Sequence, residues 1–158
     1  MPRRPRSRGA AAVEFALIFP ILFLLIYGVI VYSYIFALQS ALYFAAQEAA
    51  EAAVKVDPSA SNADDLRRSN ARSTAVSVLN WLPDGQKSRV LGSNGDAVTV
   101  NFCAAGGSGC PSDSDGVIVT LTYRLREPTD LFPIINLPMV GPVPPMPTAL
   151  TATATARI

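Results

Sequence analysis

The 158-residue sequence contains no histidine and only two cysteines. Without histidine there is no His-based catalytic triad, no imidazole metal ligand and no imidazole general base, the commonest general base in enzymes. Two isolated thiols are too few for the usual four-ligand zinc sites. The composition therefore argues against an enzyme, and we expect no cofactor, no metal and no small-molecule substrate.

Charged residues are missing from Phe15 to Leu38, a run of 24 residues. As a helix this run would measure about 36 Å, enough to cross a hydrocarbon core of about 30 Å with some tilt. A buried helix of a soluble protein would normally show a polar face, and this run has none. The absence of charge predicts a transmembrane helix near the N-terminus.

Basic residues are distributed unevenly around that run. Arg3, Arg4, Arg6 and Arg8 precede it, and no further lysine or arginine occurs before Lys55. The positive-inside rule then places the N-terminus in the cytoplasm and the rest of the chain outside. Without these four arginines the chain has nine basic and twelve acidic residues, so the net charge of the remainder is −3. We therefore do not expect a nucleic-acid partner.

Two other interpretations of the N-terminus stay open. A secretory signal peptide also begins with basic and then apolar residues, although its apolar region usually runs about 7 to 15 residues. Small residues around Tyr43 to Ala46 could serve as its cleavage site. In the second interpretation the segment is an uncleaved anchor, and Glu14 reaches the membrane interface along its own side chain.

The residues RG, then AAAVEF, then LIFPILFLLIYG resemble the N-terminus of type IV prepilins, and specifically of TadE-like minor pilins of the tight-adherence (Tad) pilus system. In that family a prepilin peptidase cuts after the glycine, here Gly9. Ala10 would become the new N-terminus, with Glu14 at its fifth position and the aromatic Phe15 after it. Residues 1–9 would then be a basic cytoplasmic leader peptide.

The spacing between Ala10 and Glu14 has a physical reading. A newly cut α-amino group has a pKa near 7.7 to 8.0, so it is largely positive at the membrane edge. In a staggered filament it can lie against Glu14 of the neighbouring subunit. Opposite charges about 4 Å apart gain about 4 kcal/mol at an effective dielectric constant of 20, which offsets part of the cost of burying them. Glu14 would thus fix the register of assembly.

The helix is predicted to continue beyond Leu38, because QSALYFAAQEAAEAAVKV contains no helix breaker before Asp57 and Pro58. Residues 10–56 would form one transmembrane and stem helix. Residues 57–158 would form a small extracytoplasmic domain. Pro20 removes one helical hydrogen bond and should bend or loosen the anchor.

A second helix is predicted from Asn62 to about Leu79, with Ser61 or Asn62 as its cap and acidic residues in its first turn. The apolar residues of this segment are expected in the core: Leu66, Ala75, Val76, Val78, Leu79 and Trp81.

Strand patterns follow this helix. SRVLGSNGDAVTVNF places Asn94 and Gly95 between two apolar runs, which predicts a hairpin. GVIVTLTYRLR alternates apolar and polar residues, and ALTATATAR alternates alanine with threonine, so both are predicted strands of an antiparallel sheet. The last strand and the preceding TYRLREP also resemble the C-terminal part of TadE-like proteins.

Residues 127–148 form a proline-rich loop that is too apolar for an idle linker. Proline argues against regular sheet there. Two interpretations stay open: the loop folds over the sheet, or it is an exposed patch that meets another pilin or an assembly protein.

Cys103 and Cys110 flank the flexible sequence AAGGSG in a segment predicted to lie outside the membrane, so we expect a disulfide. Closing this loop is worth about 2.5 kcal/mol in the chain-entropy model. Asp113 and Asp115 only faintly match a calcium loop, because Pro111 occupies the first ligand position and no glutamate follows at the required spacing.

The expected fold is α+β and pilin-like: a long N-terminal transmembrane helix that continues into a small domain with a second helix and an antiparallel sheet. The resemblance implies a minor pilin or pseudopilin of the bacterial inner membrane, and the extracellular pilus as a further location. It also implies other pilin subunits, Tad assembly proteins, the prepilin peptidase and membrane lipid as partners, and a role in pilus assembly, adhesion and biofilm formation. The alternative is an uncleaved membrane-anchored scaffold or receptor that binds a partner through its exported domain.

Overall fold

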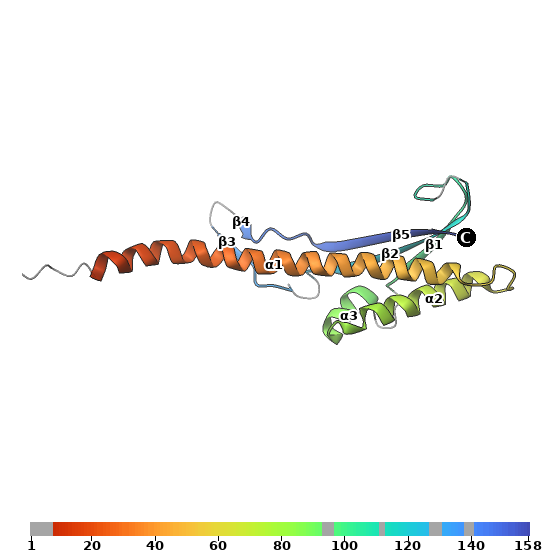
Figure 1. The fold of residues 1–158 in the computed structure, drawn as a ribbon, viewed down its shortest axis with the longest axis horizontal. Helices are drawn as coiled ribbons and strands as arrows, with labels where there is room; N and C mark the ends of the chain where they lie inside the picture. Colours follow the sequence, from red (N-terminus) through yellow and green to blue (C-terminus); the bar gives the residue numbers. More distant parts are fainter. Residues whose placement is uncertain (1–7, 93–96, 111–112, 127–130, 138–140) are drawn as a thin grey trace, which may run out of the picture.

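The computed structural model describes residues 8–92, 97–110, 113–126, 131–137 and 141–158. Its helices are α1 (Arg8–Val54), α2 (Ala63–Val78) and α3 (Asp84–Leu91), with a 3-10 turn at Leu79–Trp81. Its strands are β1 (Thr99–Cys103), β2 (Gly116–Arg124), β3 (Ile135–Leu137), β4 (Gly141–Val143) and β5 (Ala149–Arg157). Figure 1 shows one long rod, α1, with the small domain gathered along its C-terminal half. The architecture is the predicted α+β, pilin-like one.

Helix α1 is uninterrupted over 47 residues, a length of about 70 Å. Pro20 lies inside it, and the helix continues on both sides. We expected the helix over residues 10–56; it ends at Val54, just before the turn at Asp57 and Pro58. In that turn the Ser59 hydroxyl and amide both donate to Asp57 Oδ1, at 2.6 and 2.9 Å. These two hydrogen bonds lower the pKa of the Asp57 carboxyl.

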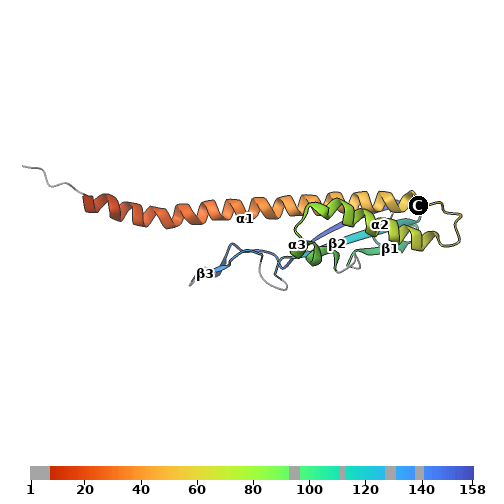
Figure 2. The same ribbon diagram turned by 90° about the horizontal axis from the view of Figure 1, so that it is seen from below.

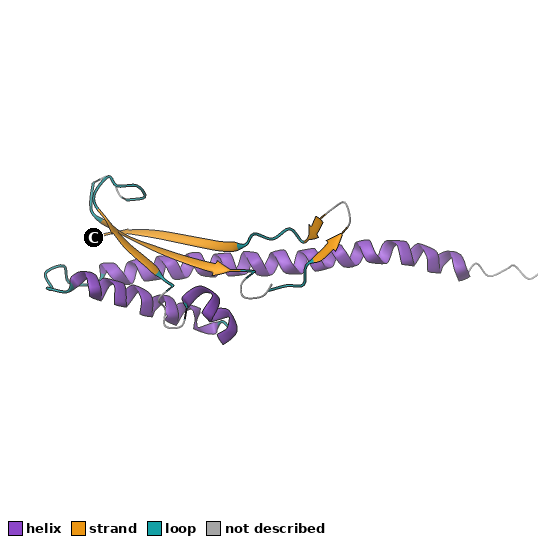
Figure 3. Cartoon of the chain, turned by 180° about the vertical axis from the view of Figure 1, so that it is seen from behind, coloured by secondary structure: helices purple, strands orange, loops and turns teal. Residues whose placement is uncertain are grey.

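The main sheet has three antiparallel strands in the order β1-β2-β5, as Figure 3 shows from behind. Strand β2 alternates as predicted, and its buried side chains are Val117, Val119, Leu121 and Tyr123, each fully inaccessible. Strand β5 buries Leu150 and Ala152 and exposes its threonines. Both strands contact α1, so the apolar face of the sheet packs against the stem helix.

Helix α2 returns antiparallel to α1 and packs closely against it (Figure 2). The buried residues of the two helices are mostly alanines, which allow the backbones to approach: Ala45, Ala46, Ala49, Ala50, Ala53, Ala71 and Ala75. The predicted extent of α2 and its acidic first turn are confirmed, although the Asn62 side chain makes no capping hydrogen bond. The expectation that Leu66, Val76 and Trp81 are core residues was wrong, because they are 39%, 37% and 60% exposed.

The prediction of a hairpin was wrong for its first strand. The run SRVL, expected as its first strand, belongs to α3. Asn94 and Gly95 lie outside the described residues. Helix α3 starts directly after Pro83, and its buried residues Val90 and Leu91 are adjacent at its C-terminal end. An apolar pair at the end of a short helix is hard to distinguish from a strand by pattern alone.

The described part of the proline-rich segment lies beyond the sheet and does not cover it. Its described residues, 131–137 and 141–146, are here called the proline arm. They contain the short antiparallel ladder of β3 and β4, in which Pro142 pairs with Asn136. The expectation that proline would exclude regular sheet was therefore wrong for these two strands. Figures 1 and 3 show the arm running beside α1, beyond the end of the main sheet and toward the N-terminus.

Candidate assembly helix and its cover

The N-terminal part of α1 is largely exposed in the described chain. Its large apolar side chains are about half exposed or more from Val13 to Ile30, except for Leu24 and Tyr27, which are partly buried. Glu14 is exposed and is the only charged residue between Gly9 and Gln47. Among the described residues, one helix is long and apolar enough to span a membrane, Gly9–Val54. Such an apolar surface on a monomer requires lipid or protein to cover it.

The predicted processing residues lie at the very start of this helix. Gly9 and Ala10 are exposed in the first turn of α1, and nothing in the described chain lies within 4 Å of a Cβ placed on Gly9. The first four N–H groups of a helix have no intrahelical acceptor, so the first turn opens more easily than the rest. Glu14 and Phe15 follow one turn further on.

An aromatic ridge runs along the exposed part of α1. It consists of Phe15, Phe19, Phe23 and Tyr27, spaced four residues apart. Successive ring centroids are 5.2, 6.3 and 6.3 Å apart. Residues four apart share a helix face, so the ridge could have been found from its spacing in the sequence. Sequence analysis singled out only its first member, Phe15.

The ridge ends where the proline arm meets the helix. The Tyr27 hydroxyl donates to the Pro133 carbonyl at 2.6 Å, and the Tyr32 hydroxyl donates to the Pro145 carbonyl at 3.0 Å. Tyr34 makes an edge-on contact with Phe132, with ring centroids 5.4 Å apart. The uncharged run therefore has an exposed part and a covered part. In the covered part, Val31, Ile35 and Leu38 are buried under the chain's own domain.

The root of the arm is fixed to the sheet. Arg126 Nη2 donates to the Met146 carbonyl at 3.1 Å, and the Leu125 amide donates to the Thr148 carbonyl at 2.9 Å. The arm thus leaves the sheet after β2 and returns to it before β5, at the same end of the sheet. It is held against α1 from Tyr27 to Tyr34. None of these tyrosine contacts was predicted from the sequence, because they join residues over 90 positions apart.

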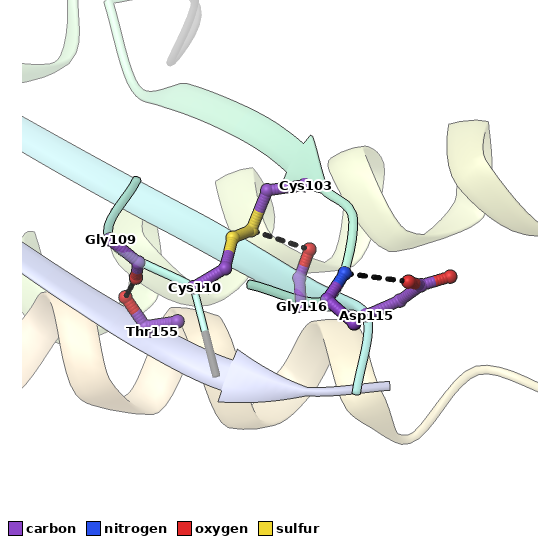
Figure 4. Close-up of a disulfide and its surroundings, with 7 residues drawn as sticks. Cys103, Gly109, Cys110, Asp115, Gly116 and Thr155 are labelled. Carbon is purple, nitrogen blue, oxygen red and sulfur yellow. Dashed lines mark hydrogen bonds between the residues drawn. A yellow bond between two sulfur atoms is a disulfide. The ribbon is translucent and has the colours of Figure 1, made fainter. Parts of the chain in front are cut away.

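The disulfide between Cys103 and Cys110 is present, as expected, at the other end of the sheet. Figure 4 shows Cys103 at the end of β1 and, at the other end of the loop, Gly109 beside Thr155 of β5. The Ala105 amide donates to Asp115 Oδ1 at 3.1 Å, and the Thr155 hydroxyl donates to the Gly109 carbonyl at 3.2 Å. Asp115 therefore binds the loop backbone. Asp113 forms an ion pair with Arg157 at 3.3 Å, so both acids of the calcium-like sequence have partners within the protein.

A long exposed apolar helix at the N-terminus, continued as the spine of a small α+β domain, fits a single-pass membrane anchor and a pilin-like fold. Residues 9–51 match a family model described as TadE-like protein, and this match confirms the resemblance seen in the sequence. The matched segment contains Gly9, Ala10, Glu14 and the whole aromatic ridge. The match covers 43 of the 158 residues and indicates a TadE-like N-terminal segment. Neither a curated protein nor a solved structure matches it.

Proposed function

We propose that the protein is a minor pilin or pseudopilin of a Tad-type pilus, processed after Gly9 by a prepilin peptidase. The observation that carries the proposal is the apolar and exposed N-terminal part of α1, with Glu14 as the one charged residue from Gly9 to Gln47, inside the segment that matches the TadE-like model. The precursor would reside in the bacterial inner membrane with its basic leader in the cytoplasm. Adhesion and biofilm formation would follow from its role in the pilus.

Cleavage is compatible with the position of the scissile bond. Gly9–Ala10 lies in the first turn of α1, which is exposed and can open without disturbing the packed half of the helix. Glycine on the leader side presents no side chain to the peptidase. The arginines of the leader would hold this end of the helix at the cytoplasmic face of the membrane.

Glu14 and the aromatic ridge would then act in assembly. A carboxylate in hydrocarbon is costly unless it is paired, and nothing within the described chain pairs with Glu14. The α-amino group of Ala10 in a neighbouring subunit is a partner of the required charge. The ridge from Phe15 to Tyr27 provides a continuous surface for helix–helix packing beside it.

The proposal is tested by replacing Glu14 with alanine in the native host. Glu14→Ala should insert into the membrane at the normal level but should fall at least about tenfold in sheared filaments, since loss of a pair worth more than about 1.4 kcal/mol changes an equilibrium tenfold. The amount of protein in membrane and filament fractions measures this.

Glu51→Ala is the matched control, because Glu51 is an exposed glutamate on the same helix, within the packed stem. It should enter filaments normally. Normal incorporation of Glu14→Ala would remove the role assigned to Glu14. Equal loss of both variants would point to a general defect of the helix instead.

A further inference from the structure

We propose that the tip of the proline arm enters the outer leaflet of the membrane beside α1, so that the protein contacts lipid at a second site. The inference rests on the proposed membrane span of α1. The tip consists of the described residues of β3 and β4, of which Ile135 is 37% exposed and Pro142 is exposed. The root of the arm, by contrast, packs into the core through Leu131, Phe132, Ile134 and Met146.

The depth of the arm follows from the length of the helix. A hydrocarbon core of about 30 Å takes about 20 helical residues. Counted from Ala10, at the end of the basic leader, its outer boundary falls near Val29 and Ile30, which are still 59% exposed. Pro133 is hydrogen-bonded to Tyr27, below that boundary, and Pro145 to Tyr32, just above it. The strands β3 and β4 follow Pro133 in the chain, and Figure 1 shows both beyond the main sheet, toward the N-terminus of α1. Figure 2 shows the same for β3.

The composition of this part of the chain suits lipid. No charged residue occurs from Leu131 to Ala156. A non-charged arm can follow the helix below the boundary without the cost of burying an ion. Tyrosines at positions 27, 32 and 34 lie on both sides of this outer boundary along α1. Tyrosine is enriched where the hydrocarbon meets the headgroups.

The backbone of the arm also has features that lower the cost of placing its polar groups in an apolar medium. Irregular backbone is costly in lipid because its N–H and C=O groups lack partners. Four of the described arm residues are prolines, which have no N–H to satisfy: Pro133, Pro142, Pro144 and Pro145. The strands of the tip pair with each other, and two tyrosine hydroxyls satisfy the carbonyls of Pro133 and Pro145. The proline content thus lowers the cost of placing a non-helical segment at this depth.

Tryptophan reporters in the full chain test the inference. The native Trp81 is replaced by phenylalanine, and one tryptophan is introduced at Ile135 or, as a second reporter, at Pro142. Phe19→Trp reports the membrane span of α1, and Ser61→Trp reports the turn at the far end of the stem. Each variant is reconstituted in phosphatidylcholine and phosphatidylglycerol vesicles, with or without brominated lipids. The bromines are at shallow acyl positions for the arm reporters and at deep acyl positions for Phe19→Trp, which lies near the bilayer centre, and Ser61→Trp is measured with both.

We expect bromolipid to reduce the emission of Ile135→Trp and Pro142→Trp to an extent comparable to Phe19→Trp, and to leave Ser61→Trp unchanged. If both arm reporters behave like Ser61→Trp while Phe19→Trp is quenched, the arm does not reach lipid and the inference fails while the membrane span stands. Blue-shifted but unquenched arm reporters would assign the tip to a protein contact, which also overturns the inference. If Phe19→Trp itself is not quenched, the membrane span fails and the inference fails with it.

Discussion

Tyr123 carries a polar hydroxyl that is buried in this small core. Its side chain is fully inaccessible, and its hydroxyl has no hydrogen-bond partner among the described residues. Burial raises its pKa to about 12, nearby Tyr34 adds to the increase, and Arg89 partly opposes it. An unsatisfied buried hydroxyl costs about 1 to 3 kcal/mol of stability. The ring of Tyr123 therefore stabilises the core by packing, and its hydroxyl opposes part of that stabilisation.

We predict that Tyr123→Phe raises the free energy of unfolding by about 1 kcal/mol at neutral pH, because it removes the unpaired hydroxyl and retains the ring. Above pH 10 the unfolded chain loses the phenol proton, while the folded protein retains it until about pH 12. The unfolded state then binds fewer protons, so the wild-type protein loses stability between these pH values, by at most about 1.4 kcal/mol per pH unit. Denaturant unfolding of the detergent-solubilised chain across this range measures both effects.

Tyr43→Phe serves as the control, because Tyr43 is 48% exposed on α1. It should change neither the stability at neutral pH nor its decline at high pH. An unaltered alkaline decline in Tyr123→Phe would show that other groups cause it.

At the scale of single residues, the sequence was most informative where chemistry is local. The two cysteines are seven positions apart, and they form the expected disulfide. Glu14 stands out because nothing else in its neighbourhood is charged. Tyr27 and Tyr32 carry no such signal, because their partners are carbonyls that any residue could provide.

At the scale of elements, the sequence pattern predicted β2 and β5 from their alternation, α1 from an uncharged run without helix breakers, and α2 from its cap and acidic first turn. It failed at α3, whose eight residues are too few for a helical pattern to emerge. It also failed at Trp81, which follows α2 in a 3-10 turn that no longer keeps the face of the preceding helix. The alanines between α1 and α2 determine how closely these helices approach.

We predict that Ala49→Leu lowers the free energy of unfolding by about 1 to 3 kcal/mol, because the added atoms enter a closely packed interior. Ala49 is completely buried in the stem. Ala37→Leu is the matched change on the exposed side of α1 and should have little effect. Denaturant unfolding compares the two. Equal stability of both variants would mean that the stem is packed more loosely than described.

At the scale of the whole molecule, the structure divides α1 into two parts with different surroundings. The N-terminal part is bare and apolar, and the rest is the spine of the domain. The uncharged run from Phe15 to Leu38 predicted one continuous span and did not reveal that its last third is covered by the proline arm and the sheet. That cover depends on where a distant loop folds back, which a local pattern does not encode.

The measurement that tests the account most directly is the N-terminal sequence and intact mass of the protein extracted from membranes of its native host. We predict a chain that begins at Ala10 and lacks the mass of residues 1–9, because the peptidase has cut after Gly9. A chain that still begins at Met1 or Pro2, in cells with an active prepilin peptidase, would contradict the account. Glu14 would then be an interfacial residue of an uncleaved anchor.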